Sequence, residues 1–160
     1  MHILISIAQQ MLTLFDDAST VVKCYPVSTA SKGVGEVRGS HCTPRGEHLI
    51  RAKIGADQPE NAVFVARRPS GEIYSPELGV ALPERDWILT RILWLSGCEP
   101  ERNRLGCVDT MRRYIYIHGC PDTSAMGVPG SHGCIRMRNA DIVDLFDRVP
   151  VYTSVDITED

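Results

Sequence analysis

Residues 113–118 read Arg-Tyr-Ile-Tyr-Ile-His, and residues 139–149 read Asn-Ala-Asp-Ile-Val-Asp-Leu-Phe-Asp-Arg-Val. The first stretch alternates between residues that favour extended backbone, so it predicts a strand. The second predicts a helix, because Asn139 is a good N-cap residue and Pro150 follows directly after the stretch. Its apolar residues recur at helical spacing and form one stripe: Ile142, Leu145, Phe146 and Val149.

Short apolar segments bounded by turn residues predict further strands. They cover residues 2–7, 10–15, 20–27, 47–54, 61–67, 86–95 and 151–157. Residues 28–46 and 119–130 predict long loops, and residues 69–85, with three Pro and two Gly, predict a surface loop or lid. The expected fold class is therefore mostly β with a short C-terminal helix.

The composition indicates a globular protein. The 160 residues predict one domain, residues 1–160, and 43% of them are hydrophobic and 23% charged. The 17 Lys and Arg against 20 Asp and Glu give a formal charge of −3 without a basic cluster, which argues against nucleic-acid binding. The longest apolar runs fall far short of the roughly 20 residues that span a bilayer, so no membrane span is expected.

The N-terminal residues carry no visible export signal. Residues 1–7 contain no Lys or Arg ahead of the apolar stretch, and Gln9 and Gln10 interrupt it. We therefore expect a cytoplasmic location, or a periplasmic one if a leader has been removed. In the cytoplasm the six cysteines would be reduced thiols rather than three disulfides.

The residues that predict chemistry lie between the strand and the helix. His118 ends the strand, and Cys134 follows sixteen residues later in Ser131-His-Gly-Cys-Ile-Arg136. A thiol is a good nucleophile only as a thiolate, and an imidazole partner can take its proton. Gly133 removes side-chain bulk where a carbonyl must approach, backbone N–H groups of the turn can face an oxyanion, and Arg136 suits a carboxylate.

Two other interpretations remain open on the residues alone. Cysteine is often buried, and a histidine at a strand end is commonly a packed structural group. A non-enzymatic zinc-binding β module is the sharper alternative, because two His-x-Cys pairs offer a tetrahedral ligand set: His118, Cys120, His132 and Cys134.

The same residues resemble a known family. Ile117-His-Gly119, a loop, and then residues 131–137 resemble the signature of the L,D-transpeptidase catalytic domain, the YkuD-like family. Residues 25–29 and Thr43-Pro-Arg-Gly46 resemble its strand with a Ser/Thr turn and its Thr-Pro-x-Gly loop. The resemblance covers the chain from about residue 20 and implies a β-rich mixed sheet, sandwich-like or barrel-like, with a short helix.

The resemblance also implies a role for each matching residue. Cys134 would be the nucleophile and His118 its base, while His132 and the backbone of Gly133 and Cys134 would line the oxyanion and substrate side. Substrate-binding positions would be Arg136, for a carboxylate, with Ser131 and Gly119. No metal or cofactor is implied. Cys120 departs from the family pattern, and a reversible Cys120–Cys134 disulfide is a hypothesis.

Family members act on peptidoglycan stem peptides. The thiolate attacks the carbonyl of the third residue, an L centre, and expels the terminal D-alanine. An amine then resolves the thioacyl-enzyme in an L,D-transpeptidase, whereas water does so in a cytoplasmic L,D-carboxypeptidase that recycles cell-wall tetrapeptides. A stem peptide or muropeptide is the expected partner, and a carbapenem is the expected covalent inhibitor.

Overall fold

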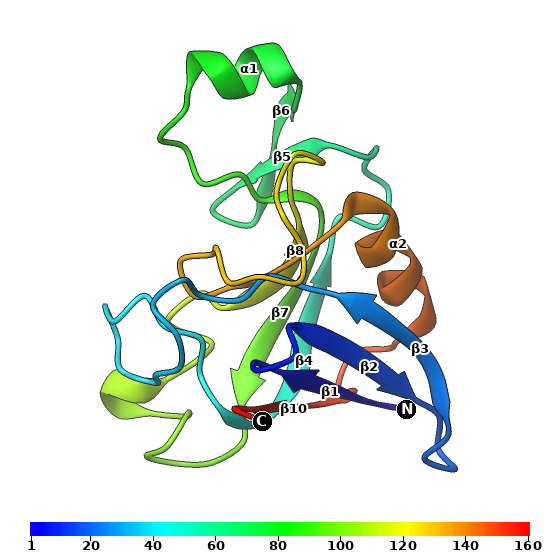
Figure 1. Ribbon diagram of the computed structural model, residues 1–160, viewed down its shortest axis with the longest axis vertical. Helices are drawn as coiled ribbons and strands as arrows, with labels where there is room; N and C mark the ends of the chain where they lie inside the picture. The colour runs from blue at the N-terminus through cyan, green and yellow to red at the C-terminus, as the bar shows by residue number, and fades with distance from the viewer.

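One curled, mixed sheet forms most of the molecule. The computed structural model describes residues 1–160, and its ten strands follow the order β3-β2-β1-β10-β4-β7-β5-β6, with β8 beside β7 and β9 beside β8 (Figure 1). Neighbouring strands are antiparallel except for the β1–β10 and β8–β9 pairs, which are parallel. The strands are β1 (His2–Ser6), β2 (Met11–Phe15), β3 (Val21–Pro26), β4 (Gly46–Ile54), β5 (Ala62–Val65), β6 (Arg68–Ile73), β7 (Leu89–Gly97), β8 (Tyr116–Gly119), β9 (Ile135–Met137) and β10 (Ser154–Thr158).

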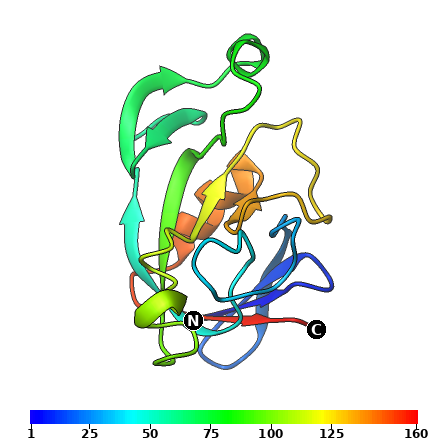
Figure 2. The same ribbon diagram turned by 90° about the vertical axis from the view of Figure 1, so that its left-hand side faces the viewer.

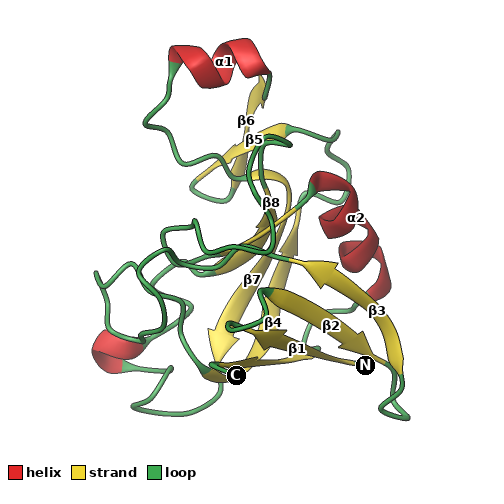
Figure 3. Cartoon of the chain, viewed as in Figure 1, coloured by secondary structure: helices red, strands yellow, loops and turns green.

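The helices α1 (Pro76–Ala81) and α2 (Asn139–Arg148) and a short 3-10 helix (Gly106–Val108) accompany the sheet, and Figure 3 draws them in red. Helix α2 packs against β7 and β8. Its bounds confirm the predicted helix, but the N-cap is Arg138 and not Asn139. The Asn139 side chain is buried instead, where it accepts a hydrogen bond from Thr90 Oγ1 and donates one to Asn61 Oδ1. Neither α-helix is long and apolar enough to cross a membrane.

The core lies inside the curl of the sheet. Nineteen buried apolar residues form one cluster that joins the two ends of the chain to its middle. Ile3 and Ile5 of β1, Leu93 and Leu95 of β7, and the apolar stripe of α2 belong to it. The strands other than β5 and β6 contribute side chains from one face to this cluster, as expected for strands that cover a core on one side. The predicted fold class is confirmed.

The predicted lid is partly wrong. Residues 69–85 were expected to be a loop, but they contain most of β6 and all of α1 (Pro76–Ala81). Ser75 Oγ accepts the N–H of Leu78, and Pro76 occupies the first helical position, so local capping starts this short helix. In Figure 2, β5, β6 and α1 project beyond the rest of the sheet.

The start of β8 and the presence of β9 also differ from the prediction. The strand expected at residues 113–118 begins only at Tyr116, because Tyr114 has a φ of +58° and breaks the extended backbone. Strand β9 was not predicted, since its three residues carry no periodicity of their own. It exists because its backbone pairs with β8.

Candidate active site

The β8–β9 register puts the predicted catalytic residues on one face of the sheet. Ile117 lies opposite Ile135, and His118 lies opposite Arg136. Side chains alternate between the two faces of a strand, so Tyr116 and His118 of β8 share a face with Arg136 of β9 and with Cys134, the residue directly before β9. Cys134 and His118 are therefore diagonal neighbours across the β8–β9 pair. The two residues are sixteen positions apart in sequence, and the loop between β8 and β9 brings them together.

Cys134 is held by the backbone that precedes β8. The N–H of Tyr116 donates to Cys134 Sγ at 3.3 Å, and Sγ donates to the carbonyl of Tyr114 at the same distance. Burial raises the pKa of the Cys134 thiol to about 12, against the opposing effects of the Tyr116 N–H and of Arg136 and Arg113. The raised pKa favours the thiol form of Cys134, which would need a base to become a nucleophile.

His118 has the protonation state that a base requires. Its side chain is 1% exposed, and Nδ1 lies 2.6 Å from the carbonyl oxygen of Gly119. A carbonyl only accepts, so Nδ1 carries the hydrogen and the lone pair of Nε2 is free. Burial lowers the pKa of His118, although the Gly119 carbonyl and Asp86 oppose the shift. His118 and Cys134 make no hydrogen bond with each other, and Nε2 has no partner in the protein.

The backbone of the turn before Cys134 by itself favours a glycine. Gly133 has a φ of +128°, and a Cβ there would lie 3.2 Å from Ile115 Cδ1 and 3.3 Å from the carbonyl oxygen of Cys42. Backbone conformation and packing therefore favour glycine here, and room for a substrate carbonyl stays a prediction. Thr43, from the predicted Thr-Pro-x-Gly loop, donates its hydroxyl to the Gly133 carbonyl at 2.9 Å.

Only one of the two N–H groups expected at the oxyanion side is available. The N–H of Gly133 donates to Ser131 Oγ, whereas the N–H of Cys134 has no acceptor within the protein. His132 lies at the same opening, with 62% of its side chain exposed. The structure therefore offers the Cys134 N–H, and not that of Gly133, to a developing negative charge.

Two residues expected to bind substrate are buried instead. Ser131 is 1% exposed, and its hydroxyl donates to the carbonyl of Cys134, so it braces the turn. Gly119 is also buried, and a Cβ there would collide with the Leu89 carbonyl and with Asn139. The carbonyl oxygen of Gly119 contacts His118 Nδ1. Both residues support the catalytic groups rather than line the opening.

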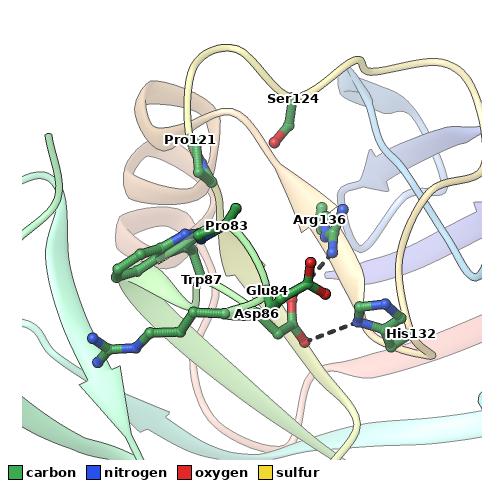
Figure 4. Close-up of a pocket in the computed structure, with 9 residues that line it drawn as sticks. Pro83, Glu84, Asp86, Trp87, Pro121, Ser124, His132 and Arg136 are labelled. Carbon is green, nitrogen blue, oxygen red and sulfur yellow. Dashed lines mark hydrogen bonds and ion pairs between the residues drawn. The ribbon is translucent and has the colours of Figure 1, made fainter. Parts of the chain in front are cut away.

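Asp86 is a site residue that sequence reasoning missed. Its Oδ1 accepts a hydrogen bond from Arg136 Nη2 at 3.1 Å, and its Oδ2 lies 3.5 Å from His132 Nδ1 (Figure 4). Burial disfavours its charge, but the neighbouring Arg136 guanidinium and the imidazoles of His118 and His132 outweigh burial and hold the pKa of Asp86 below its ordinary value. Asp86 fell in a stretch predicted as strand, and no motif links it to residues 50 positions away.

Two clefts meet at Asp86 and His132. One is polar and includes Arg136 in its wall, as Figure 4 shows. The other opens beside Cys134, and hydrophobic side chains from β5, from β7 and the residue before it, and from the segment that runs into β8 form most of its walls: Phe64, Ile88, Ile92, Tyr114, Ile115 and Tyr116. A cleft with apolar walls and a few fixed polar groups is the usual form of a small-ligand site.

The zinc alternative has no geometric basis in the structure. No group of three or more His, Cys, Asp or Glu side chains is arranged to hold a metal ion. Cys120 is buried, and its thiol donates to the Met137 carbonyl at 3.2 Å. All six cysteines are free, and the Cys120–Cys134 disulfide stays a hypothesis.

Sequence and fold comparisons point to the same family. The family model of the L,D-transpeptidase catalytic domain, YkuD, matches residues 1–157. The curated protein "Probable L,D-transpeptidase YbiS" of Escherichia coli K12 is 44% identical over 48 residues, which are 30% of this chain and 16% of that protein.

Solved structures share the fold across 98% of this chain. An L,D-transpeptidase from Xylanimonas cellulosilytica has a TM-score of 0.61 at 20% identity, and 59% of that chain is covered. The L,D-transpeptidase LdtMt1, solved in complex with imipenem, has a TM-score of 0.58 at 19% identity with 57% covered. The chain thus spans less than two thirds of the length of these relatives. With residues 1–157 matched, the chain belongs to the L,D-transpeptidase catalytic domain family.

Proposed function

We propose that this chain is a cysteine acyltransferase that acts on peptidoglycan stem peptides. Cys134 attacks the carbonyl of the third residue, an L centre, and the terminal D-alanine leaves. One observation carries the proposal: the β8–β9 register puts Cys134, at the mouth of an apolar cleft, on the same face as a neutral His118 whose Nε2 is free. A packed structural cysteine needs neither the cleft nor the fixed imidazole.

The first half of the reaction moves one proton, forms the bond between Cys134 Sγ and the carbonyl carbon, and breaks the C–N bond to the leaving D-alanine. His118 Nε2 takes the proton of the Cys134 thiol as Sγ forms a bond to the carbonyl carbon, and the carbonyl oxygen becomes an oxyanion. The imidazolium then gives that proton to the departing amine as the C–N bond breaks, which leaves a thioester. The raised pKa of Cys134 and the lowered pKa of His118 favour a neutral resting pair, so the charges form only during the reaction.

The oxyanion needs a donor that is not already engaged. The N–H of Cys134 meets this condition, and His132, exposed at the same opening, is the proposed second contact. A fixed backbone donor aimed at the developing charge contributes about 3–4 kcal/mol to catalysis in well-studied enzymes. Gly133 takes part through the shape of the turn.

The acceptor decides which enzyme of the family this is. An amine that attacks the thioester forms a new amide as the C–S bond breaks, and its proton passes through His118 to the departing Cys134 sulfur, as in a transpeptidase. Water reacts along the same path and leaves a tripeptide with a free carboxylate, as in a carboxypeptidase. We propose transpeptidation as the main reaction and hydrolysis as the alternative. The expected cytoplasmic location stays a proposal, and it would favour water, because polymeric acceptor strands lie outside the cytoplasmic membrane.

Product analysis by mass spectrometry tests the proposal. A muropeptide with a tetrapeptide stem is incubated with the protein, with and without an acceptor amine. We expect loss of D-alanine in both reactions and an amide product when the amine is present; loss of D-alanine alone would favour the carboxypeptidase. Cys134→Ala should abolish turnover, whereas Cys24→Ser, which changes an exposed thiol of β3, should not. Turnover by Cys134→Ala would refute the mechanism.

A further inference from the structure

Arg67 reaches the Cys134 cleft from the turn between β5 and β6. It is among the residues that line the cleft. Ala66 and Arg67 form the turn with φ values of +49° and +63°, a conformation that hairpin turns usually assign to Asn and Gly. The sequence gives no sign of this turn, and the family resemblance assigns no role to Arg67.

Aromatic side chains hold the Arg67 guanidinium in place. Its central carbon lies 4.5 Å from the ring centroid of Tyr114 and 4.9 Å from that of Trp94. Nη1 donates to the hydroxyl of Tyr116 at 3.0 Å. Cation–π contacts with two rings fix the plane of the guanidinium beside the backbone that binds Cys134 Sγ.

Arg67 keeps most of its hydrogen-bond donors unused. A guanidinium has five N–H groups, and here one of them has a protein acceptor. None of the nine ion pairs of the structure includes Arg67. Asp86 is the one acidic residue in the wall of this cleft, and it is paired with Arg136.

The other two arginines near Cys134 are engaged. Arg136 donates to Asp86 and to the carbonyl of Gly130. Arg113 donates to three acceptors of the loop after β3: the Gly35 carbonyl, Ser40 Oγ and the Cys42 carbonyl. Arg67 is therefore the arginine of this cleft with donors ready for a ligand.

We propose that Arg67 is a specificity-determining residue that binds a carboxylate of the acyl-donor peptide in the Cys134 cleft. The inference rests on the proposed function and names the group that the donor must carry. Two parallel N–H groups of a guanidinium match the two oxygens of a carboxylate, and partly apolar walls strengthen the pair. The carboxylate is either the terminal one of the leaving residue or a side-chain one of the stem.

Three donor peptides separate these sources: the free tetrapeptide, its C-terminal amide, and a version amidated at the side-chain carboxylate. We expect Arg67→Gln to lower kcat/KM by about 10- to 100-fold on the free tetrapeptide, mainly through KM, as for a lost charge-assisted hydrogen bond. On the peptide that lacks the recognised carboxylate, wild type and Arg67→Gln should differ less than about twofold, because the partner of Arg67 is absent. Arg67→Lys should restore only part of the loss, since it keeps the charge without the planar fork.

Arg68→Gln is the matched control, because Arg68 is the exposed next residue and makes no side-chain hydrogen bond. An equal loss for Arg67→Gln on all three peptides would mean that Arg67 only shapes the cleft, and no loss on any of them would mean that it does not bind the donor. Either result overturns the inference while wild-type turnover preserves the proposed function. If wild type turns over none of the peptides, the proposed function fails, and this inference fails with it.

Discussion

Arg136 Nη2 donates to Asp86 Oδ1 at 3.1 Å, and this ion pair joins the loop before β7 to strand β9 at the opening of the site (Figure 4). The side chains are 19% and 40% exposed, so water partly screens the pair. Arg136 was expected to bind a substrate carboxylate. Its binding role stays a prediction, and a substrate would have to displace Asp86 to use the same guanidinium.

Replacement of this carboxylate should make the nucleophile more acidic. After burial, which is the largest cause, the charge of Asp86 contributes to the raised pKa of Cys134. We therefore expect the pKa of the Cys134 thiol to be lower in Asp86→Asn than in wild type. The rate of Cys134 alkylation by iodoacetamide, followed against pH, measures the change.

Glu84→Gln is a suitable control for this experiment. Glu84 lines the same polar cleft but forms no ion pair. If Asp86→Asn and Glu84→Gln give the same pH profile as wild type, Asp86 does not act on the sulfur.

Loss of the base should slow acylation far more than it perturbs the fold. Gln at position 118 keeps a side-chain donor for the Gly119 carbonyl but has no basic nitrogen. We expect His118→Gln to lower the rate of thioester formation by about 100- to 10,000-fold, the usual effect of a lost general base. Rapid-quench mass spectrometry of the acyl-enzyme measures it, and a rate within tenfold of wild type would remove His118 from the mechanism, since general bases contribute roughly 100-fold or more.

The pH profile of kcat/KM should show where His118 titrates. Activity requires the neutral imidazole, and burial lowers its pKa below the ordinary 6.5. The acidic limb should therefore lie below pH 6.5, and activity should be lost as the pH falls through the lowered pKa. The thiol, with a pKa of about 12, should add no basic limb near neutrality. An acidic limb above 6.5 would contradict this assignment.

A second buried histidine should make stability depend on pH. His48 is 2% exposed; Nδ1 donates to the Gly46 carbonyl and Nε2 accepts from Thr110 Oγ1. Burial lowers the pKa of His48 to about 4, so the unfolded chain binds the proton first. This contribution to the free energy of unfolding is complete above pH 6.5 and should shrink by about 3 kcal/mol as the pH falls to 4.

Urea unfolding between these pH values measures the slope. His48→Gln should flatten it, because Gln does not titrate. His2→Gln, in which the histidine of β1 is only partly buried, is the control and should keep the wild-type slope. Equal slopes for His48→Gln and wild type would show that another group causes the acid sensitivity.

Local signals in the sequence predicted the main helix and the strands other than β6 and β9, because burial on one face leaves a periodic pattern that needs no knowledge of the partner. The segment from Ile3 to Ile5 and the stripe of α2 are examples. Residues such as Asp86 and Arg67 could not be predicted in this way. Their positions depend on how the β5–β6 hairpin and the loop before β7 are placed beside Cys134, and that arrangement is set by pairing between distant segments.

In the predicted site, too, the motif located residues along the chain but not the direction of their polar groups. The signature around Cys134 placed the nucleophile and the histidine together, but it assigned Ser131 and Gly119 to the substrate when both are buried supports. Family resemblance transfers residue types along the chain, whereas the direction of an N–H or a hydroxyl depends on backbone angles. The φ of Gly133 is one such angle, and it turns one N–H toward Ser131.

A covalent-adduct experiment tests the central claim most directly. Intact-protein mass spectrometry with imipenem, followed by peptide mapping, reports whether an activated sulfur is present and where it lies. The account predicts one adduct per chain, located on Cys134, slow to form in His118→Gln and absent in Cys134→Ser. An adduct on another cysteine, or equal labelling of the His118→Gln variant and wild type, would contradict it.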